Sequence, residues 1–339
     1  MKAGILDRLG EIGSLVEPYL EKYLASGASE EFREAVLYQV KTGGKRVRPA
    51  LTILSALAAG GRPEDALPIA AAIELVHNYS LILDDIIDRG EVRRGLPTTW
   101  KKYGLCTAIL VAVHYREAIA EAICESKHSE RLHELIARTV KTIVEGERLD
   151  VLFEQAGREG EPYVLEHRRE WITLDDYFRM VYAKTGALIE AACRAGAIVA
   201  DAESRVEEAL GEYGKCVGIA FQIADDIIDI FGKEEKMGKK VGKDVIEHKL
   251  GNVVLLLALE ELESADRDRL LSILRSEEVG DREVAEAVEL VKKTSARERA
   301  YGLGEEYLKR ALSRLAELPD SDAKRDLAEL AEFVLYRAF

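Results

Sequence analysis

Proline and strand-forming patterns are scarce in this chain. Only seven prolines occur in 339 residues. Alternating apolar and polar residues between Asn-Gly or Asp-Gly turns, which would indicate a half-buried sheet, are not visible. Alanine, leucine, glutamate, lysine and arginine instead recur at the spacing of an α-helix. The sequence therefore predicts an all-α protein.

Further properties of the sequence argue against particular classes of protein. The four cysteines form no CxxC pair, which favours reduced thiols and a cytoplasmic location over disulfides or a zinc site. A net charge of −14 argues against a nucleic-acid partner, which would need a basic face. The longest apolar runs are too short to span a bilayer, and the first seven residues are not typical of a signal peptide. We therefore expect no stable membrane insertion.

One acidic motif stands out because it occurs twice. Asp-Asp-Ile-Ile-Asp occupies residues 84–88 and again residues 225–229, each time beside apolar residues. In a helix, the first and last aspartates of this motif lie on one face, one turn apart. Such carboxylates repel one another, and burying them is costly unless cations offset the charge. Two such clusters on facing helices are typical of a site for Mg²⁺ that carries a diphosphate.

Helical patterns run almost without interruption along the chain. The expected helices lie at residues 30–42, 47–59, 65–88, 107–126, 129–155, 174–198, 202–231 and 248–263, with more in the C-terminal third. Residues 89–102 are basic and turn-rich, 157–163 read as an exposed loop, and 233–243 read as a basic loop. No long linker is visible, so we expect a single domain over residues 1–339. It would be a bundle in which the two acidic helices face each other across a central cavity.

Basic residues gather near both acidic motifs. They are Lys45, Arg46 and Arg48 after a Gly-Gly break, Arg93 and Arg94 beyond the first motif, Lys184 within an apolar helix, and Lys239 and Lys249 beyond the second motif. Any one of them alone is more often a helix cap or a solvated surface charge. Their joint placement, with lysines and arginines at turns and helix starts, favours diphosphate binding.

These segments give the chain a resemblance to a known family. The matching segments are Gly43-Gly-Lys-Arg-Val-Arg-Pro49, Glu74-Leu-Val-His77, the first acidic motif with Arg93-Arg94-Gly95-Leu-Pro97, Lys184-Thr185, Phe221-Gln222 with the second acidic motif, Gly238-Lys239 and Gly242-Lys-Asp244. In this order and spacing the chain resembles the trans-isoprenyl diphosphate synthases, or polyprenyl synthetases, and among them the archaeal geranylgeranyl type. The resemblance implies the isoprenoid-synthase fold, a homodimer, and head-to-tail condensation of isopentenyl diphosphate with an allylic prenyl diphosphate.

The resemblance also implies a role for each matching residue. Asp84, Asp85, Asp88, Asp225, Asp226 and Asp229 would hold Mg²⁺, with Mn²⁺ as an alternative, and Asp84 and Asp225 count among the catalytic groups. Arg93, Lys184 and Lys239 would bind the allylic diphosphate, with Lys249 nearby, while Lys45, Arg48, His77 and Arg94 would bind isopentenyl diphosphate. Lys184, Thr185 and Gln222 would line the reacting centre. A core position is the alternative for His77, although it lies seven residues before Asp84 on nearly the same helical face.

In this family, side chains one turn before the first motif set the product length. Tyr79 and Ser80 stand there, and Tyr79 lies roughly 7 Å along the helix axis from Asp84. A single bulky aromatic resembles the pattern of enzymes that make the C20 product geranylgeranyl diphosphate. The C15 farnesyl and C25 geranylfarnesyl products remain alternatives, because Tyr79 can also be a core residue beside the small Ser80.

Three positions depart from the family pattern. Ala112-Val113 replaces a Gly-Asp pair, Glu147 replaces the glutamine that usually follows Gly146, and Gly251 replaces a threonine. Each change can be neutral drift in packing, or together they can mark an altered substrate or acceptor. Two other functions on this scaffold stay open: a class I terpene cyclase or prenyltransferase with another acceptor or connectivity, and a noncatalytic subunit. The Lys45 and Arg48 set and the intact second motif argue against cyclisation, and the two complete acidic motifs argue against a noncatalytic subunit.

Overall fold

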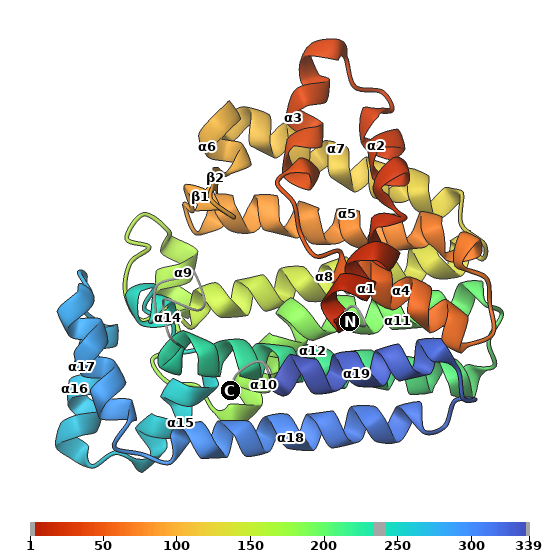
Figure 1. Ribbon diagram of the computed structural model, residues 1–339. Helices are drawn as coiled ribbons and strands as arrows, with labels where there is room; N and C mark the ends of the chain where they lie inside the picture. Colours follow the sequence, from red (N-terminus) through yellow and green to blue (C-terminus); the bar gives the residue numbers. More distant parts are fainter. Residues whose placement is uncertain (1–3, 233–241, 337–339) are drawn as a thin grey trace. The chain divides into compact units, whose positions relative to one another are not determined.

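The computed structural model describes residues 4–232 and 242–336, and most of them lie in helices (Figure 1). The helices of the first half are α1 (Ile5–Ser14), α2 (Glu17–Ala25), α3 (Glu30–Lys41), α4 (Val47–Ala58), α5 (Pro63–Ile87), α6 (Thr99–Tyr103), α7 (Leu105–Cys124), α8 (Ser129–Leu152) and α9 (Pro162–His167). Those of the second half are α10 (Leu174–Val181), the π-helical turn η1 (Tyr182–Gly186), α11 (Ala187–Val199), α12 (Ser204–Phe231), α14 (Lys243–Ile246), α15 (Val253–Glu261), α16 (Ser264–Leu274), α17 (Asp281–Val291), α18 (Ala296–Leu315) and α19 (Asp322–Tyr336). The prediction of an all-α protein is confirmed.

The strands of the described residues form one short hairpin. β1 (Val92–Arg93) and β2 (Leu96–Pro97) pair antiparallel, with Arg93 opposite Leu96. The hairpin falls within the basic, turn-rich stretch that the sequence indicates.

Two helices differ from their expected form for local reasons. The helix expected from residue 248 begins only at Val253, because the Asn252 side chain accepts hydrogen bonds from the N–H groups of Val254 and Leu255 and caps it there. The helix expected over residues 174–198 contains the π-helical turn at Lys184. Turns of this kind inside α-helices are frequent at functional sites.

The chain divides into two compact units. Unit 1 consists of Met1–Lys141, Leu188–Gly214 and Leu312–Leu330, and unit 2 of Thr142–Ala187, Lys215–Ala311 and Ala331–Phe339. The first acidic motif therefore belongs to unit 1 and the second to unit 2. The single domain and the central cavity expected from the sequence stay predictions.

The core of unit 1 is built around α5. This helix packs against α4 and α7, and α4 packs against α1 (Figure 1). Pro63 stands at its start, where a proline costs no hydrogen bond. Ala70, Ala71 and Ala72 are fully buried, and such small side chains let neighbouring helices approach closely. By length and composition α5 could cross a membrane, but 61% of its most apolar window is buried inside the protein, as in the core helix of a soluble domain.

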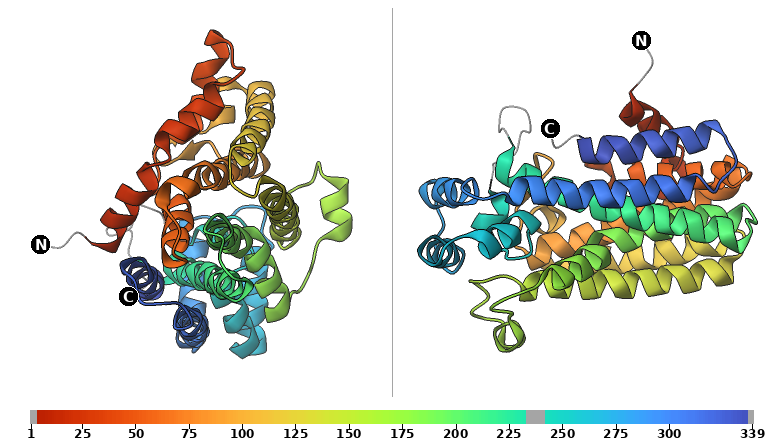
Figure 2. Two further views of the ribbon diagram at one scale, coloured as in Figure 1. Left: turned by 90° about the vertical axis from the view of Figure 1, so that its right-hand side faces the viewer. Right: turned by 90° about the horizontal axis from the view of Figure 1, so that it is seen from below.

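The core of unit 2 contains α15. Its residues Val253 to Leu259 are all buried, which is typical of a helix surrounded by other elements. It packs against α10 and α17, and α16 and α17 lie side by side, as the blue pair in Figure 2 shows. α15 thereby carries the backbone N–H of Val253 to the second acidic motif.

Candidate active site

The first acidic motif lies at the C-terminal end of α5. Asp84 and Asp85 stand in its last turn and Asp88 is the residue that caps it. Negative charge at a helix C-terminus opposes the helix dipole, so this end requires a cation. Arg93 supplies one: its Nε donates to Asp85 Oδ1 at 2.9 Å, and its Nη2 donates to Asp84 Oδ2 at 2.8 Å. Burial raises the pKa of Asp85, an effect that Arg93 opposes and that Asp84 and Asp88 reinforce.

A tight hairpin brings Arg93 to this position. Arg94 and Gly95 form its turn with φ of 54° and 77°, and two consecutive positive φ values are typical of the turns that join antiparallel strands. The Thr98 hydroxyl and the Trp100 indole each donate to the carbonyl oxygen of Gly90 at 2.7 Å. These bonds fix the hairpin beside the end of α5 (Figure 1).

A cationic corner lies next to the first motif in unit 1. Burial lowers the pKa of His77 well below its usual value, and Arg48, Arg94 and Arg93 lower it further, so the imidazole is neutral. The Nε of Arg48 is buried and has no hydrogen-bond acceptor among the described residues. A buried guanidinium N–H without an acceptor costs free energy, and a phosphate oxygen would satisfy it.

Arg46 behaves differently from its neighbours in the basic segment after α3. Its guanidinium is buried and donates to Glu17 at 2.7 Å, to Glu74 at 2.8 Å and to the Val40 carbonyl at 2.7 Å. Asn78 also donates to Glu74, at 3.1 Å. Arg46 therefore anchors the segment, whereas Lys45 lies exposed beside it. The glutamate of the segment Glu74-Leu-Val-His77 has a structural partner rather than a ligand.

The second acidic motif lies near the C-terminal end of α12 and is surrounded by polar donors. Asp226 is buried and accepts from the Tyr177 hydroxyl at 2.7 Å, from Gln222 at 3.0 Å and from the Val253 N–H at 2.9 Å. Burial and the nearby Asp244 raise the pKa of Asp226 well above its usual value.

Asp229 shares this acidic environment. It accepts from the N–H groups of Lys243 at 3.0 Å and Asp244 at 3.2 Å. Burial and the charge of Asp244 still raise the pKa of Asp229 to about 7. Asp225 is partly buried. The second cluster thus lies among further carboxylates, whereas the first lies among arginines.

The turn η1 places two predicted residues in unit 2. Lys184 Nζ lies 2.6 Å from Asp150 Oδ2 and 2.8 Å from Glu147 Oε2. The Thr185 hydroxyl donates to Gln222 Oε1 at 3.1 Å, and Gln222 in turn donates to Asp226. A chain of hydrogen bonds therefore joins the predicted reacting-centre residues to the second acidic motif.

Comparison with known proteins identifies the scaffold. Residues 29–291 match the family model described as polyprenyl synthetase. The chain belongs to the polyprenyl synthetase family. It is 38% identical to the short chain isoprenyl diphosphate synthase of Methanothermobacter thermautotrophicus, with 98% of each chain covered. It is 34% identical to the geranylfarnesyl diphosphate synthase of Aeropyrum pernix, over 95% of this chain and 99% of that one. The crystal structure of geranylgeranyl pyrophosphate synthetase from Pyrococcus horikoshii matches with a TM-score of 0.88, 32% identity and 98% of each chain covered.

Membership of the polyprenyl synthetase family confirms the resemblance, and with it the assignment of the chain as a prenyltransferase. The family uses divalent metal ions. Carboxylate oxygens are the ligands that hard cations such as Mg²⁺ prefer, so the chemistry of the six aspartates fits such an ion. Among the described residues, however, no three acids, histidines or cysteines already form a ready-made metal site. The individual roles of the site residues stay predictions.

Sequence reasoning missed several polar residues of this polyprenyl synthetase site. Asp150 is buried between Lys184 and Lys249, which lies 3.1 Å from it. Burial alone would raise the pKa of Asp150, but the two lysines hold it well below its usual range. Tyr177 meets the second motif as described above, and so does Asp244, which belongs to a matching segment but has no role assigned from the sequence. The spacing of Glu147 and Asp150, three residues apart on α8, is the one sequence signal that could have indicated a shared partner.

The remaining predicted positions are distributed as follows. Lys249 also lies 3.2 Å from Glu247. On α5, Tyr79 is partly buried and the Ser80 hydroxyl donates to the His77 carbonyl at 2.8 Å. Lys239 falls outside the described residues.

The departures from the family pattern occupy three different settings. Ala112 is buried on α7 and Val113 is exposed. A Cβ at Gly251 would lie 2.9 Å from the Cε of Met180, so a threonine there would require the methionine to move. Glu147 lies against Lys184 in unit 2, where it bears on the site.

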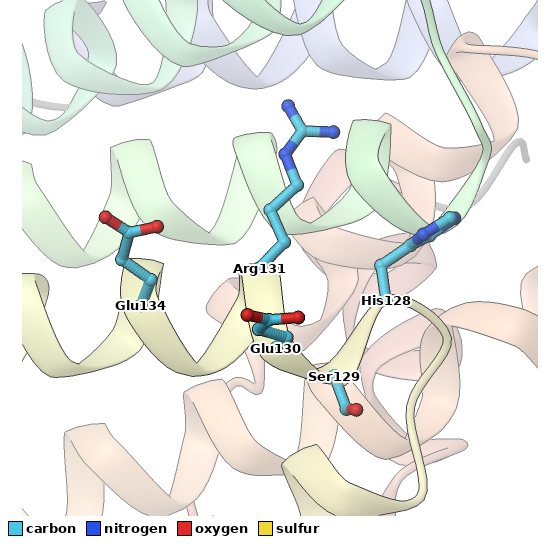
Figure 3. A pocket seen from close by; sticks show the side chains of 5 residues that line it. All are labelled: His128, Ser129, Glu130, Arg131 and Glu134. Carbon is cyan, nitrogen blue, oxygen red and sulfur yellow. The ribbon is translucent and has the colours of Figure 1, made fainter.

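One surface pocket lies away from the acidic motif of unit 1. It has a volume of about 430 Å³ and is lined by His128, Ser129, Glu130, Arg131 and Glu134, with Arg131 extending away from Ser129 (Figure 3). The adjacent Lys127 pairs with Asp65 in the first turn of α5. Asp65 and Asp84 stand nineteen residues apart on this helix, or roughly 28 Å along its axis. This pocket is therefore separate from the first acidic motif.

Proposed function

We propose that the protein condenses isopentenyl diphosphate with an allylic diphosphate, head to tail, and releases a short-chain prenyl diphosphate. The observation that carries this proposal is the pairing of two features in unit 1. Among the described residues Arg48 offers a buried N–H without an acceptor, and Asp84 and Asp85 at the end of α5 already hold a cation, Arg93. One feature suits a phosphate, and the other suits a cation that accompanies a phosphate.

The site residues would fall into groups according to the ligand that they hold. Arg48, Arg94, Lys45 and the neutral His77 would hold isopentenyl diphosphate, while Arg93, Lys184 and the undescribed Lys239 would hold the allylic diphosphate. Asp84, Asp88, Asp225 and Asp229 would hold divalent ions, with Mg²⁺ as the proposed metal. Asp85 and Asp226 already accept hydrogen bonds from Arg93, Tyr177 and Gln222, and would orient their neighbours.

The reaction follows from this division. When bound, the metal ions neutralise the diphosphate leaving group. Arg93 and Lys184 would stabilise the charge that develops on the diphosphate as the allylic C–O bond breaks. The double bond of isopentenyl diphosphate attacks C1 of the allylic cation, and a proton then leaves, with the released diphosphate as its acceptor. Thr185 and Gln222, held together by their hydrogen bond, would line the cation.

Product analysis tests this proposal directly. The purified protein is incubated with Mg²⁺, isopentenyl diphosphate and, separately, dimethylallyl, geranyl or farnesyl diphosphate, and the products are identified by mass. Elongated prenyl diphosphates are expected. A cyclised hydrocarbon would instead indicate a terpene cyclase, and no product with any partner would contradict the proposal.

We propose geranylgeranyl diphosphate as the main product. Tyr79 on α5 precedes Asp84 by little more than one turn, so its ring would limit the growing chain. Tyr79→Ala should shift the product from C20 to longer chains, measured by mass spectrometry. Tyr19→Ala, which changes a tyrosine of α2, is the matched control, and an unchanged C20 limit in Tyr79→Ala would place the limit elsewhere.

We further propose a homodimer formed through α7. Leu105, Ile109, Leu110 and Val113 are each between 46% and 60% exposed and share one side of this helix. An apolar stripe of this kind usually marks an interface, and a second copy of the chain offers the same stripe in return. Leu110→Glu with Val113→Glu should yield monomers in sedimentation, whereas Glu117→Gln on the same helix should not. A wild-type monomer would contradict this proposal.

We also propose a cytoplasmic location, which agrees with the four free cysteines.

A further inference from the structure

A network of ion pairs among the described residues surrounds Lys184 in unit 2. Its members are Lys184, Lys249 and Lys243, which pair with Glu147, Asp150 and Glu247 at N–O distances between 2.6 and 3.2 Å. Asp150 stands at the centre, between Lys184 and Lys249. The three ammonium groups and the three carboxylates balance one another in charge.

The backbone keeps Glu147 and Lys184 together. A Cβ at Gly146 would lie 2.3 Å from the backbone nitrogen of Lys184, so α8 and the turn η1 touch at this glycine without a side chain between them. Glu147 follows directly on α8, and its carboxylate reaches the Lys184 ammonium at 2.8 Å. The contact between the two elements therefore keeps the Glu147 carboxylate within reach of the Lys184 ammonium.

The charge balance of the network decides how much net positive charge Lys184 presents to a phosphate. Asp150 alone, shared by Lys184 and Lys249, would leave one positive charge unbalanced. Glu147 removes that charge at the Lys184 end, and Glu247 faces Lys249 at the other end. The Glu147 side chain is 17% exposed against 8% for Asp150, so Glu147 is the carboxylate of this pair that can more readily turn away.

We propose that Glu147 sets how tightly the enzyme holds the diphosphate of its allylic substrate and product, by competing for the ammonium of Lys184. This inference rests on the proposed function, in which Lys184 contacts that diphosphate. Glu147 is then a positioning residue: its ion pair with Lys184 forms again when the elongated product leaves. The Glu147 carboxylate favours release of the product diphosphate and lowers the affinity for the allylic diphosphate.

The decisive variant is Glu147→Gln, which keeps the shape and removes the charge. The KM for the allylic diphosphate should fall about three- to tenfold, the size expected for the net gain of one hydrogen bond. The KM for isopentenyl diphosphate should not change, and kcat should fall if product release limits turnover. Glu145→Gln is the matched control, because Glu145 pairs with Arg148, three residues along α8, and not with Lys184. A merely structural defect would change both KM values together, and that result would overturn the inference, as would a higher KM for the allylic diphosphate.

Two further measurements separate this inference from the proposed function. In a Lys184→Ala background, Glu147→Gln should no longer alter the KM for the allylic diphosphate, because the ammonium for which Glu147 competes is absent. Calorimetric titration with inorganic diphosphate and Mg²⁺ should show tighter binding to Glu147→Gln than to wild type, without any turnover. If the wild type elongates no allylic diphosphate, the proposed function fails and calorimetry alone decides. An unchanged dissociation constant for diphosphate would then overturn the role of Glu147.

Discussion

The same five residues, Asp-Asp-Ile-Ile-Asp, meet two opposite environments in this protein. At the end of α5, Arg93 bridges the first two aspartates, and Arg94 lies near Asp85. Near the end of α12, Asp226 is enclosed by hydroxyl, amide and backbone donors, and Asp244 adds a further negative charge. Among the described residues, Asp84 and Asp85 are paired with a cation, whereas Asp226 accepts its hydrogen bonds from neutral donors.

The difference teaches that the neighbours of a motif decide its chemistry. A carboxylate paired with an arginine can exchange that partner for a metal ion at modest cost, because both are cations. A carboxylate that accepts three hydrogen bonds from neutral groups is part of the framework, and moving it leaves those donors unsatisfied. The first cluster is therefore adapted to exchange partners, and the second is held in place at Asp226.

The sharpest test of the comparison asks whether both clusters serve one reaction. Asp84→Asn and Asp225→Asn should each lower kcat/KM by about 10²–10³-fold, because each removes charge that faces the diphosphate leaving group. The measurement is steady-state elongation at saturating Mg²⁺. Asp320→Asn, at a side chain that is 93% exposed, should leave the rate unchanged. Loss of activity in only one of the two site variants would show that the clusters do not act together.

The middle aspartates of the two motifs should differ in stability. Asp226→Ala leaves the Tyr177 hydroxyl, the Val253 N–H and the Gln222 amide without their acceptor, and should lower the free energy of unfolding by about 3 kcal/mol. Asp85→Ala leaves Arg93 paired with Asp84, and should cost only about 1 kcal/mol. Urea denaturation of both variants measures the difference. Equal losses would break the distinction between an exchangeable cluster and a fixed one.

The basic surroundings of the first cluster should also appear in the pH dependence of stability. Because the folded pKa of His77 lies well below its ordinary value, the unfolded chain binds a proton below about pH 6.5 while the folded one does not. Stability is therefore lost as the pH falls below 6.5, by up to about 1.4 kcal/mol per pH unit from this residue. Denaturation of wild type and His77→Gln between pH 5 and 7 isolates the contribution. Parallel curves would mean that His77 is not desolvated among the arginines.

Much of the fold follows from sequence pattern because the helices are long and periodic. α5, α8 and α12 lie close to their expected limits, since their apolar spacing and terminal residues are unambiguous. The late start of α15 depends on the side chain of Asn252, and the π-helical turn depends on tertiary packing at Gly146. Neither feature leaves a periodic pattern in the sequence.

The site was predictable where a motif is local and not where partners come from distant segments. Arg93 follows Asp84 by nine residues, so a tight turn suffices to join them. Asp150 reaches Lys184 and Lys249 from a different helix, and the spacing of Glu147 and Asp150 alone does not identify those lysines as the partners. The role of Arg46 was hidden for the same reason, because Glu74 and Glu17 lie far from it along the chain.

The two asparagines of the chain have a chemical consequence. Asn78 and Asn252 are both fully buried, and each holds its amide against acidic residues, Glu74 in one case and Asp244 in the other. Asparagine amides hydrolyse on ageing and heating when water reaches them, and thermophilic proteins contain few of them. The folded protein therefore exposes no asparagine to slow deamidation. A mass increase at either residue would record that the chain had opened, and would serve as an internal clock of unfolding.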